Sequence, residues 1–227
     1  MKAGKYCFKD LFVNRYVQRI IVPEIQRDYV WGEIQVKGLL NSILSDWERY
    51  LNGSIPSLLN GSEDDLQAFK SFYKRRNYSS NIGFIYAYNE PSYDGKYFLI
   101  DGQQRVTTLY LLLAVLANRN KLLREHFKRN YCFEGLPKLG YRVRIASNEF
   151  LNIFIDFVMN GGSNIDGQLW MLDYYKNDIT GHSILSNYKI IHSVLDEKEL
   201  KDEELFFSYV EELTEFWYFD TNVSEQG

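Results

Sequence analysis

Apolar residues recur along the chain with two different periods, and the longer period indicates helices. From Val36 onward, Leu40, Ile43, Trp47 and Leu51 follow at spacings of three or four residues, which places their side chains on one face of a helix. Glycine and proline come shortly afterwards in the sequence. We expect the helix to end there, because both residues interrupt a helix.

Short runs of β-branched and aromatic residues indicate strands. Residues 20–23 form one such run, which Pro23 stops, and residues 82–88 and 97–100 form two more. The segment between the last two contains a proline and an Asp-Gly pair, which are turn-forming residues. We expect these two strands to pair as a hairpin, with further strands at 141–145 and 216–220.

A helical pattern begins directly after the strand at 97–100. Val106, Leu109, Leu113 and Leu116 are in register, and the residues between them make the helix apolar on nearly all sides. Such a helix is normally buried. We therefore expect it at the centre of the core.

The order of these elements predicts an α+β fold in two parts. Residues 1–146 carry most of the predicted strands, and within them 52–80 form a polar surface insertion with a short helix near 63–76. Residues 147–227 are expected to form a helical subdomain. The helices expected there span 148–160, 167–177, 183–195 and 199–215.

Composition excludes several classes of protein. The chain has 227 residues, of which 45% are hydrophobic, enough for a substantial core. The best apolar run, 109–117, is too short to span a bilayer, and the N-terminus has no signal-like apolar segment. Cys7 and Cys132 fit no disulfide or zinc spacing. We therefore expect a cytoplasmic protein without a membrane partner.

Charge is distributed unevenly. The net charge is −4, yet residues 119–144 hold eight basic and two acidic residues, while 196–215 hold nine acidic and two basic ones. A basic tract can contact nucleic acid or phosphate. A solvated basic face beside a solvated acidic helix explains the same pattern without any ligand. Both interpretations stay open at this point.

Polar residues fill the junction between the strand ending at Ile100 and the buried helix. The segment reads Asp101-Gly102-Gln103-Gln104-Arg105. Backbone N–H groups and the helix dipole favour an anion at such a junction, and glycine lets a ligand approach the backbone closely. The residues expected to bind a nucleotide here are Gly102, Gln103, Arg105, Thr107 and Thr108.

Helix capping competes with ligand binding as the explanation of this segment. Asp101 and Gln104 have the spacing of a capping box, which satisfies a helix end without a ligand. Capping leaves Arg105 unexplained, because a cation in the first turn opposes the helix dipole by about 0.3–1 kcal/mol. We therefore expect Arg105 to face a bound phosphate or carboxylate, and its replacement by alanine to spare the fold.

A second polar motif, Gln26-Arg27-Asp28-Tyr29, follows the strand at 20–23 and precedes Trp31. It is either a surface turn with aromatic rings packed below or part of a binding site. The two motifs would form one cleft if their strands were neighbours in one sheet, which the sequence does not decide. The nucleotide-binding residues expected from this motif are Gln26, Arg27, Tyr29 and Trp31.

The two motifs together resemble a known family. The segments 21–31 (IVPEIQRDYVW) and 101–109 (DGQQRVTTL) are similar to the N-terminal domain of the GmrSD family of modification-dependent restriction proteins. The similarity extends more weakly over Arg142–Glu149 and Ser186–Tyr188. It implies a ParB/sulfiredoxin-like fold, a small mixed sheet with helices, whose loop at Gly102–Arg105 holds the phosphates of a nucleotide.

The resemblance also implies an activity and roles for residues. In family members with demonstrated activity this domain binds and hydrolyses nucleoside triphosphates (NTPs), and a later HNH-type domain cuts modified DNA. Arg27 and Arg105 would contact phosphate, and Gln103 and Gln104 would position phosphate, metal or water. Asp101 would cap the helix and help to hold Mg²⁺ through water. The catalytic residues implied are Asp101, Gln103, Gln104 and Arg105, with Mg²⁺ and an NTP as cofactors.

The chain departs from the family pattern in two ways. Residues 52–80 are longer than the usual link, and the sequence ends where the pattern would continue towards a nuclease domain. His126, His182 and His192 have no HNH-like spacing. We therefore expect this chain to cut no DNA by itself, and DNA to be reached through a further domain or partner subunit.

Three functions are thus compatible with the sequence. The first is an NTP-binding and NTP-hydrolysing regulatory domain of a restriction or phage-defence protein. The second is a nucleic-acid-binding module in which residues 119–144 follow the phosphate backbone and Tyr and Trp side chains stack on bases. The third is a scaffold that docks another subunit, in which the motif at 101–105 acts only as a helix cap. Whether the chain forms an oligomer stays open.

Overall fold

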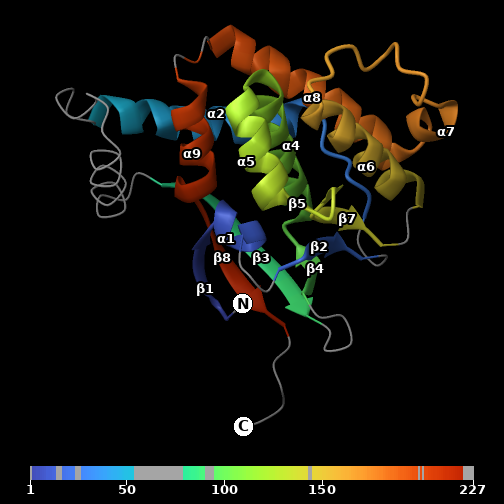
Figure 1. Ribbon diagram of the computed structural model, residues 1–227. Coiled ribbons are helices and arrows are strands. Elements are labelled where there is room, and N and C mark those ends of the chain that lie inside the picture. The colour runs from blue at the N-terminus through green and yellow to red at the C-terminus, as the bar shows by residue number, and fades with distance from the viewer. Residues whose placement is uncertain are drawn as a thin grey trace.

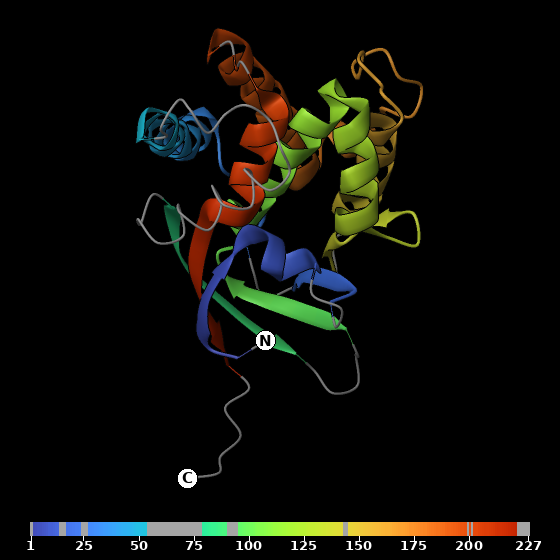
Figure 2. The same ribbon diagram turned by 60° about the vertical axis from the view of Figure 1, so that its left-hand side comes forward.

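A six-stranded mixed sheet with helices on one face forms the frame of the protein in the computed structural model (Figures 1 and 2). The structure describes residues 2–13, 17–23, 27–53, 79–89, 95–142, 145–198, 200 and 202–221. In spatial order the strands are β1 (Gly4–Cys7), β8 (Thr214–Asp220), β3 (Ser80–Asn89), β4 (Lys96–Asp101), β2 (Arg19–Val22) and β7 (Leu139–Tyr141).

Three neighbouring strands of this sheet, β4, β2 and β7, run parallel. Ile21 of β2 lies opposite Phe98 of β4 on one side and Gly140 of β7 on the other. β3 is antiparallel to β4, as the predicted hairpin requires, and β8 joins the sheet parallel to β3 and antiparallel to β1. The α+β class is therefore confirmed. The strands that precede the two polar motifs are neighbours.

The central helix α4 (Gln103–Arg119) fills the space between the sheet and the other helices. Every residue from Leu109 to Ala117 is fully buried, as its apolar sequence predicts. It contacts α5, α6, α8 and α9. Within the described residues the other helices are α1 (Phe8–Val13), α2 (Glu33–Gly53), α5 (Lys121–Tyr131), α6 (Ile145–Met159), α7 (Asp173–Lys176), α8 (Ile179–Lys198) and α9 (Glu203–Leu213). A small hairpin pairs β5 (Cys132–Phe133) with β6 (Leu136–Pro137).

Alternation along the strands separates the two faces of the sheet. Ile85, Leu99 and Phe216 belong to the core beneath the helices, whereas their chain neighbours point to the opposite face. The described helices all lie on the core side (Figure 2). The other face of the sheet is therefore covered by none of them.

Several predicted elements differ from the structure at their boundaries. The strand predicted at 141–145 is wrong beyond Tyr141, because β7 ends there and Ile145 begins α6. Of the helix predicted at 167–177, only Asp173–Lys176 is helical. The helix predicted near 63–76, like most of the predicted insertion, lies outside the described residues.

The hydrophobic core is continuous across residue 146, where the sequence suggests a boundary. Helices α6, α8 and α9 pack on α4, and β8 returns from the helical part to pair with β1 and β3. Among the described residues, no helix is long and apolar enough to cross a membrane. Neither Cys7 nor Cys132 forms a disulfide among the described residues.

Candidate functional site

The junction between β4 and α4 begins with a glycine that no other residue type replaces without strain. Gly102 has φ +91°, and a Cβ added to it would lie 3.0 Å from Ile85 Cγ1 and 3.3 Å from Phe84 O. Gly102 is also the N-cap of α4, and no side chain caps this helix start. The predicted capping box is therefore wrong, and Asp101 does not cap the helix.

Gln104 is directed instead to the second polar motif. Its Oε1 accepts hydrogen bonds from the backbone N–H of Val30 at 3.0 Å and of Trp31 at 3.1 Å. Its Nε2 donates to the backbone oxygen of Asp28 at 2.7 Å. Three of the four hydrogen-bonding positions of this amide are thus engaged, and Gln104 is buried. The two motifs, far apart in sequence, meet through this side chain.

A buried polar network fixes the same segment to α8. The Tyr29 hydroxyl hydrogen-bonds to Thr108 Oγ1 at 2.8 Å and accepts from Asn187 Nδ2 at 3.0 Å. The backbone N–H of Tyr29 donates to Thr180 Oγ1, which in turn donates to Asp28 Oδ1. Burial raises the pKa of Tyr29 to about 12, although both side-chain hydrogen bonds act in the opposite direction. The phenol is therefore neutral at physiological pH.

The remaining predicted site residues on α4 are also enclosed. Thr107 and Thr108 are completely buried, and Thr107 Oγ1 hydrogen-bonds to the Tyr141 hydroxyl at 3.1 Å. Gln103 is 5% exposed. Trp31 is partly exposed, and its backbone oxygen accepts from Asn187 Nδ2 at 2.6 Å. Any contribution of the two threonines to ligand binding therefore goes through the segment that they support.

Arg105 has acceptors within the chain. Its Nη1 donates to Ile82 O at 2.6 Å and its Nη2 to Phe84 O at 2.8 Å, while Asp101 Oδ2 lies 3.4 Å from Nη2. These oxygens flank Gly83, which has φ +86° and lies at a register irregularity of β3. The guanidinium thus stabilises an irregular strand. These internal acceptors account for an arginine at the helix start, so its presence there does not require a bound anion.

Arg27 differs from Arg105 because it is exposed. No hydrogen bond or ion pair holds its side chain within the described part of the chain. It directly precedes the segment held by Gln104, beyond the carboxyl end of β2, while Gly102 follows the carboxyl end of the adjacent β4. Gln26, the other polar residue predicted here, lies outside the described residues.

Arg142 and Thr180 also lie near this edge of the sheet, although neither belongs to the two polar motifs. Arg142 follows β7, its backbone N–H donates to Val22 O at 3.1 Å, and its Cζ lies 5.4 Å from the centre of the Phe98 ring. Thr180, at the start of α8, is completely buried beneath the segment that carries Arg27. No spacing in the sequence connects Thr180 with Tyr29. Only the packing of α8 reveals the contact.

Comparison with known protein families agrees with this arrangement. The family model of the GmrSD restriction endonuclease N-terminal domain matches residues 8–225. The chain belongs to this family. No curated protein matches it. The matched region contains both polar motifs together with Thr180 and Asn187, and the membership places the protein among restriction and defence proteins.

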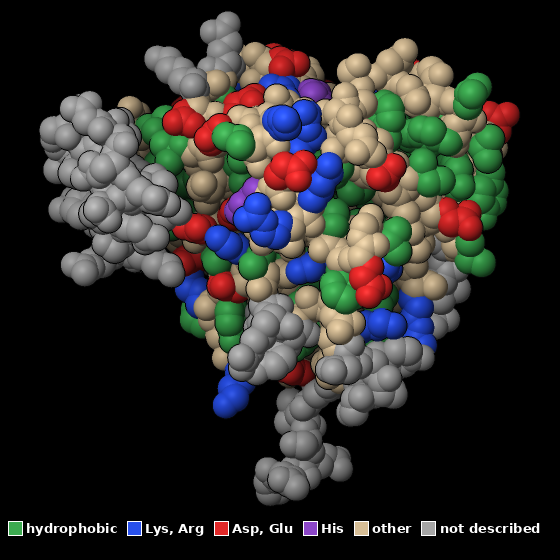
Figure 3. All heavy atoms as spheres, in the orientation of Figure 1, with side chains coloured by type: hydrophobic (Ala, Val, Ile, Leu, Met, Phe, Trp, Pro, Cys, Tyr) green, Lys and Arg blue, Asp and Glu red, His purple; other side chains and the backbone are tan. Residues whose placement is uncertain are grey.

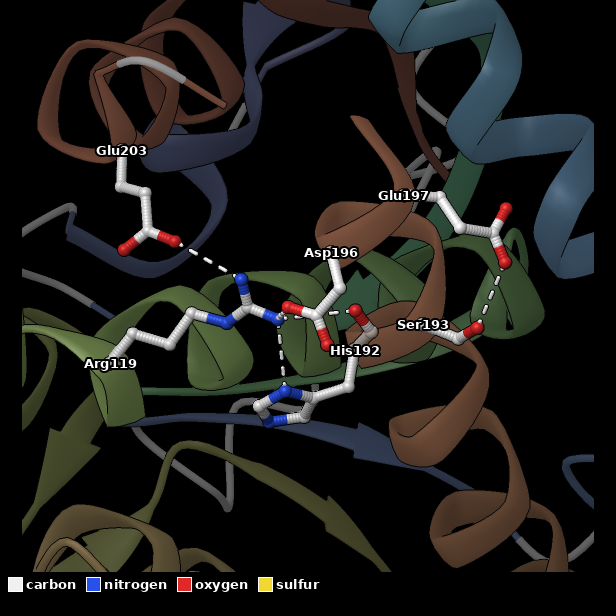
Figure 4. A network of polar contacts seen from close by, with 6 residues as sticks. All are labelled: Arg119, His192, Ser193, Asp196, Glu197 and Glu203. Atoms are coloured by element: carbon white, nitrogen blue, oxygen red, sulfur yellow. Dashed lines mark hydrogen bonds and ion pairs between the residues drawn. The ribbon is translucent and has the colours of Figure 1, made fainter. Parts of the chain in front are cut away.

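The first residue of the basic tract of this GmrSD N-terminal domain pairs with the acidic tract. Arg119, at the end of α4, donates to Asp196 Oδ1 at 2.7 Å and to Glu203 Oε1 at 3.2 Å (Figure 4). His126 Nε2 lies 2.8 Å from Glu211 Oε1. On the surface over α5, Lys and Arg side chains alternate with Asp and Glu (Figure 3). This favours the interpretation of paired, solvated faces over a continuous basic track.

The histidines of this GmrSD domain have structural surroundings. His192 accepts from Arg119, and His126 contacts both Glu211 and Asn130. Among the residues described, no group of three or more His, Cys, Asp or Glu side chains is arranged to hold a metal ion.

Proposed function

We propose that this chain binds a nucleoside triphosphate with Mg²⁺ at the edge where Arg27 and Gly102 meet, and hydrolyses it, as the regulatory domain of a restriction protein. The proposal rests most on Arg27. Its guanidinium is exposed and has no partner among the described residues, and it directly precedes the segment that Gln104 holds at the start of α4, a helix start that no side chain caps. Both features offer donors to one anionic ligand.

The topology supports the same location. Ligands of open α/β sheets bind outside the carboxyl ends of the strands, where the following loops diverge. Here β2 and β4 are parallel neighbours, so the loops after them begin at the same edge. Gln104 holds the first of these loops against the start of α4, which keeps Arg27 near the backbone N–H groups of the first turn.

The residues then divide into contacting and supporting groups. Arg27, Gly102 and the first backbone N–H groups of α4 would contact phosphate. Gln104, with Tyr29 and Thr108 beneath it, would hold the Arg27 segment in place. Arg105 would shape β3 beside Gly102, with its remaining N–H groups directed to phosphate, and Gln103 would position phosphate or water.

Asp101 is the side chain that suits Mg²⁺ best at this edge. Its carboxylate is 58% exposed and has only a long contact of 3.4 Å to Arg105. Protein Mg²⁺ sites commonly use one or two carboxylates together with substrate phosphates, so a single carboxylate acting through water fits. The ion would supply charge neutralisation on the phosphates.

The experiment is calorimetric titration of the chain with each NTP in the presence of Mg²⁺. Arg27→Ala should weaken binding about tenfold to a hundredfold, because a charge-assisted hydrogen bond contributes about 1.5–3 kcal/mol. Arg129→Ala is the matched control, since Arg129 is an exposed arginine on α5, remote from this edge in sequence and on another element. Its affinity should equal that of the wild type.

Hydrolysis is measured separately as release of phosphate. Asp101→Asn should lower the rate and its dependence on Mg²⁺ while the melting temperature stays close to that of the wild type, because the side chain is exposed. Absence of binding for every NTP, or equal affinity of wild type and Arg27→Ala, would contradict the proposal. The first result would favour a scaffold that docks another subunit.

A further inference from the structure

The face of the sheet that none of the described helices covers carries a cluster of aromatic rings outside the proposed nucleotide site. Phe84 of β3 and Trp217 of β8 are register partners and are 49% and 43% exposed. Tyr86 and Phe219 are the next outward-facing pair, and their rings stack at 5.1 Å with an interplanar angle of 16°. We call Phe84, Tyr86, Trp217 and Phe219 the aromatic patch.

The four rings lie on one surface because of strand alternation. Ile85 and Ala87 on β3, and Phe216 and Tyr218 on β8, belong to the core, so the residues between them face away from the helices. The Phe219 ring also contacts Phe84, at 5.9 Å between centroids. Exposure of large rings in one patch is costly in water, and such patches commonly mark a binding surface.

Cations flank the aromatic patch on the same face. Lys5 of β1 lies opposite Trp217 and pairs with Glu215. On the other side, Arg19 of β2 and Lys96 of β4 are register partners, and alternation with core residues places both on this face.

Beyond them, the Arg142 guanidinium lies over the outward-facing Phe98 ring. Strands β2 and β7 contain no acidic residue, and β4 has one, Asp101, at its end. The β4–β2–β7 half of this face is therefore basic, whereas the β3–β8 half is aromatic.

We propose that this face binds single-stranded nucleic acid, with bases stacked on the aromatic patch and phosphates along Arg19, Lys96 and Arg142. Aromatic rings stack on any nucleobase, and basic side chains beside them neutralise the backbone. An open sheet with exposed rings suits unpaired bases, because a duplex encloses its base faces. The six strands span about 24 Å at the usual strand spacing of about 4.8 Å, enough for a few nucleotides.

This surface is distinct from the proposed nucleotide site. The aromatic patch lies on the face of the sheet, whereas Arg27 and Gly102 lie beyond the ends of β2 and β4. A restriction protein must engage DNA, and at the basic tract Arg119 and His126 contact acidic residues of the chain. The open face provides an alternative surface for that contact.

The test is binding of a short fluorescent oligothymidine and of a duplex of equal length to the 227-residue chain, at two salt concentrations. The single strand should bind more tightly than the duplex, and more weakly at higher salt. Phe84→Ala should weaken binding at least about fivefold, since one stacked base contributes substantially to affinity. Tyr174→Ala is the matched control, because Tyr174 is an equally exposed aromatic residue on α7.

A second measurement uses the fluorescence of Trp217. Stacking of a base on its indole should quench the emission, and Trp217→Phe should abolish this quenching while it keeps most of the affinity, because the phenyl ring still stacks. Arg27→Ala and saturating NTP should leave oligothymidine binding unchanged, which separates this proposal from the nucleotide site.

Other outcomes would overturn the proposal. These are equal binding by Phe84→Ala and wild type, tighter binding of the duplex than of the single strand, or displacement of the oligothymidine by NTP. A wild-type dimer that Phe84→Ala dissociates would show instead that a second copy covers this face.

Discussion

The Nε2 atom of Gln104 donates a hydrogen bond to the backbone oxygen of Asp28 at 2.7 Å, across 76 positions of sequence. The same side chain accepts two N–H groups from the next turn of the chain. Gln104→Met keeps the length of the side chain but leaves these three backbone groups without their partner. We expect a loss of about 1–3 kcal/mol in the free energy of unfolding.

Thermal unfolding checks this expectation. For a chain of this size each kcal/mol lowers the melting temperature by about 2–4 °C. Gln35→Met is the control, because Gln35 is exposed and bonds only the backbone N–H of Gly32. Equal melting temperatures for the two variants would show that Gln104 does not hold the segment after Asp28.

Arg105→Ala should destabilise the fold, contrary to what its position in the first helical turn predicts. The substitution leaves the carbonyl oxygens of Ile82 and Phe84 without their charged donor. We expect a loss of about 1–3 kcal/mol. Arg105→Lys should recover only part of it, because a lysine does not present the two-pronged donor geometry of a guanidinium. Denaturant unfolding measures both losses.

Arg129→Ala, at an exposed arginine on α5, is the control for the unfolding measurements on the two Arg105 variants. Any effect of Arg105→Ala on nucleotide affinity is interpretable only after its stability has been measured. A wild-type midpoint for Arg105→Ala would mean that the irregular part of β3 does not depend on this side chain.

Gln104 and Arg105 show how much of the structure can be predicted from the sequence. The period of the apolar residues predicts the buried helix at 103 and the hairpin before it, because burial determines both patterns. The chemistry of the segment at 101–105 predicts a polar junction, but it does not reveal which side chain turns towards which loop. Gln104 and Arg105 are adjacent, yet one holds the segment after Asp28 and the other holds β3.

The difference arises from contacts over long sequence separations. The register irregularity of β3 near Gly83 places two carbonyl oxygens within reach of Arg105. Helix α8 brings Thr180 and Asn187 beneath Tyr29. Neither contact is visible in a local pattern. α5 differs, since Leu123, Phe127 and Tyr131 recur every four residues and provide its buried face, which is a local helical signal.

Cys132 should react slowly with iodoacetamide at neutral pH. Burial raises the pKa of its thiol to about 11, so little reactive thiolate is present. A Cys7→Ser variant isolates the reaction of Cys132, and the same variant in denaturant gives the reference rate. We expect alkylation to be at least about tenfold slower in the folded protein. Equal rates in the two states would contradict this burial.

Both cysteines should also be dispensable for nucleotide binding, because neither lies at the edge that carries Arg27. A double variant with serine at positions 7 and 132 is measured in the same NTP titration, with its melting temperature as the control for folding. A large loss of affinity in a folded double variant would place a thiol in the site.

His192 should make the protein less stable in mild acid. Arg119 Nη2 lies 3.0 Å from His192 Nδ1 (Figure 4), and since arginine only donates, Nδ1 is the acceptor of a neutral ring. Burial, and then Arg119, lower the pKa of His192 below its ordinary value of 6.5, while Asp196 acts in the opposite direction. Asp166, Lys189 and Glu197 line a cavity together with His192, and Glu203 of α9 pairs with Arg119.

The direction of the effect follows from proton uptake. Above pH 6.5 the ring is neutral in both the folded and the unfolded chain, so its contribution to stability is fully present. As the pH falls below 6.5, the unfolded chain takes up a proton that the folded chain resists, and stability is lost until the folded pKa is reached. His192→Gln keeps an acceptor for Arg119 but does not titrate, so its unfolding free energy should depend less on pH in this range. His182→Gln, at an exposed histidine of the same helix, should retain the wild-type slope. If the slopes of all three proteins agree between pH 5 and 7, a range that brackets the ordinary histidine pKa of about 6.5, the hydrogen bond from Arg119 does not control the charge of His192.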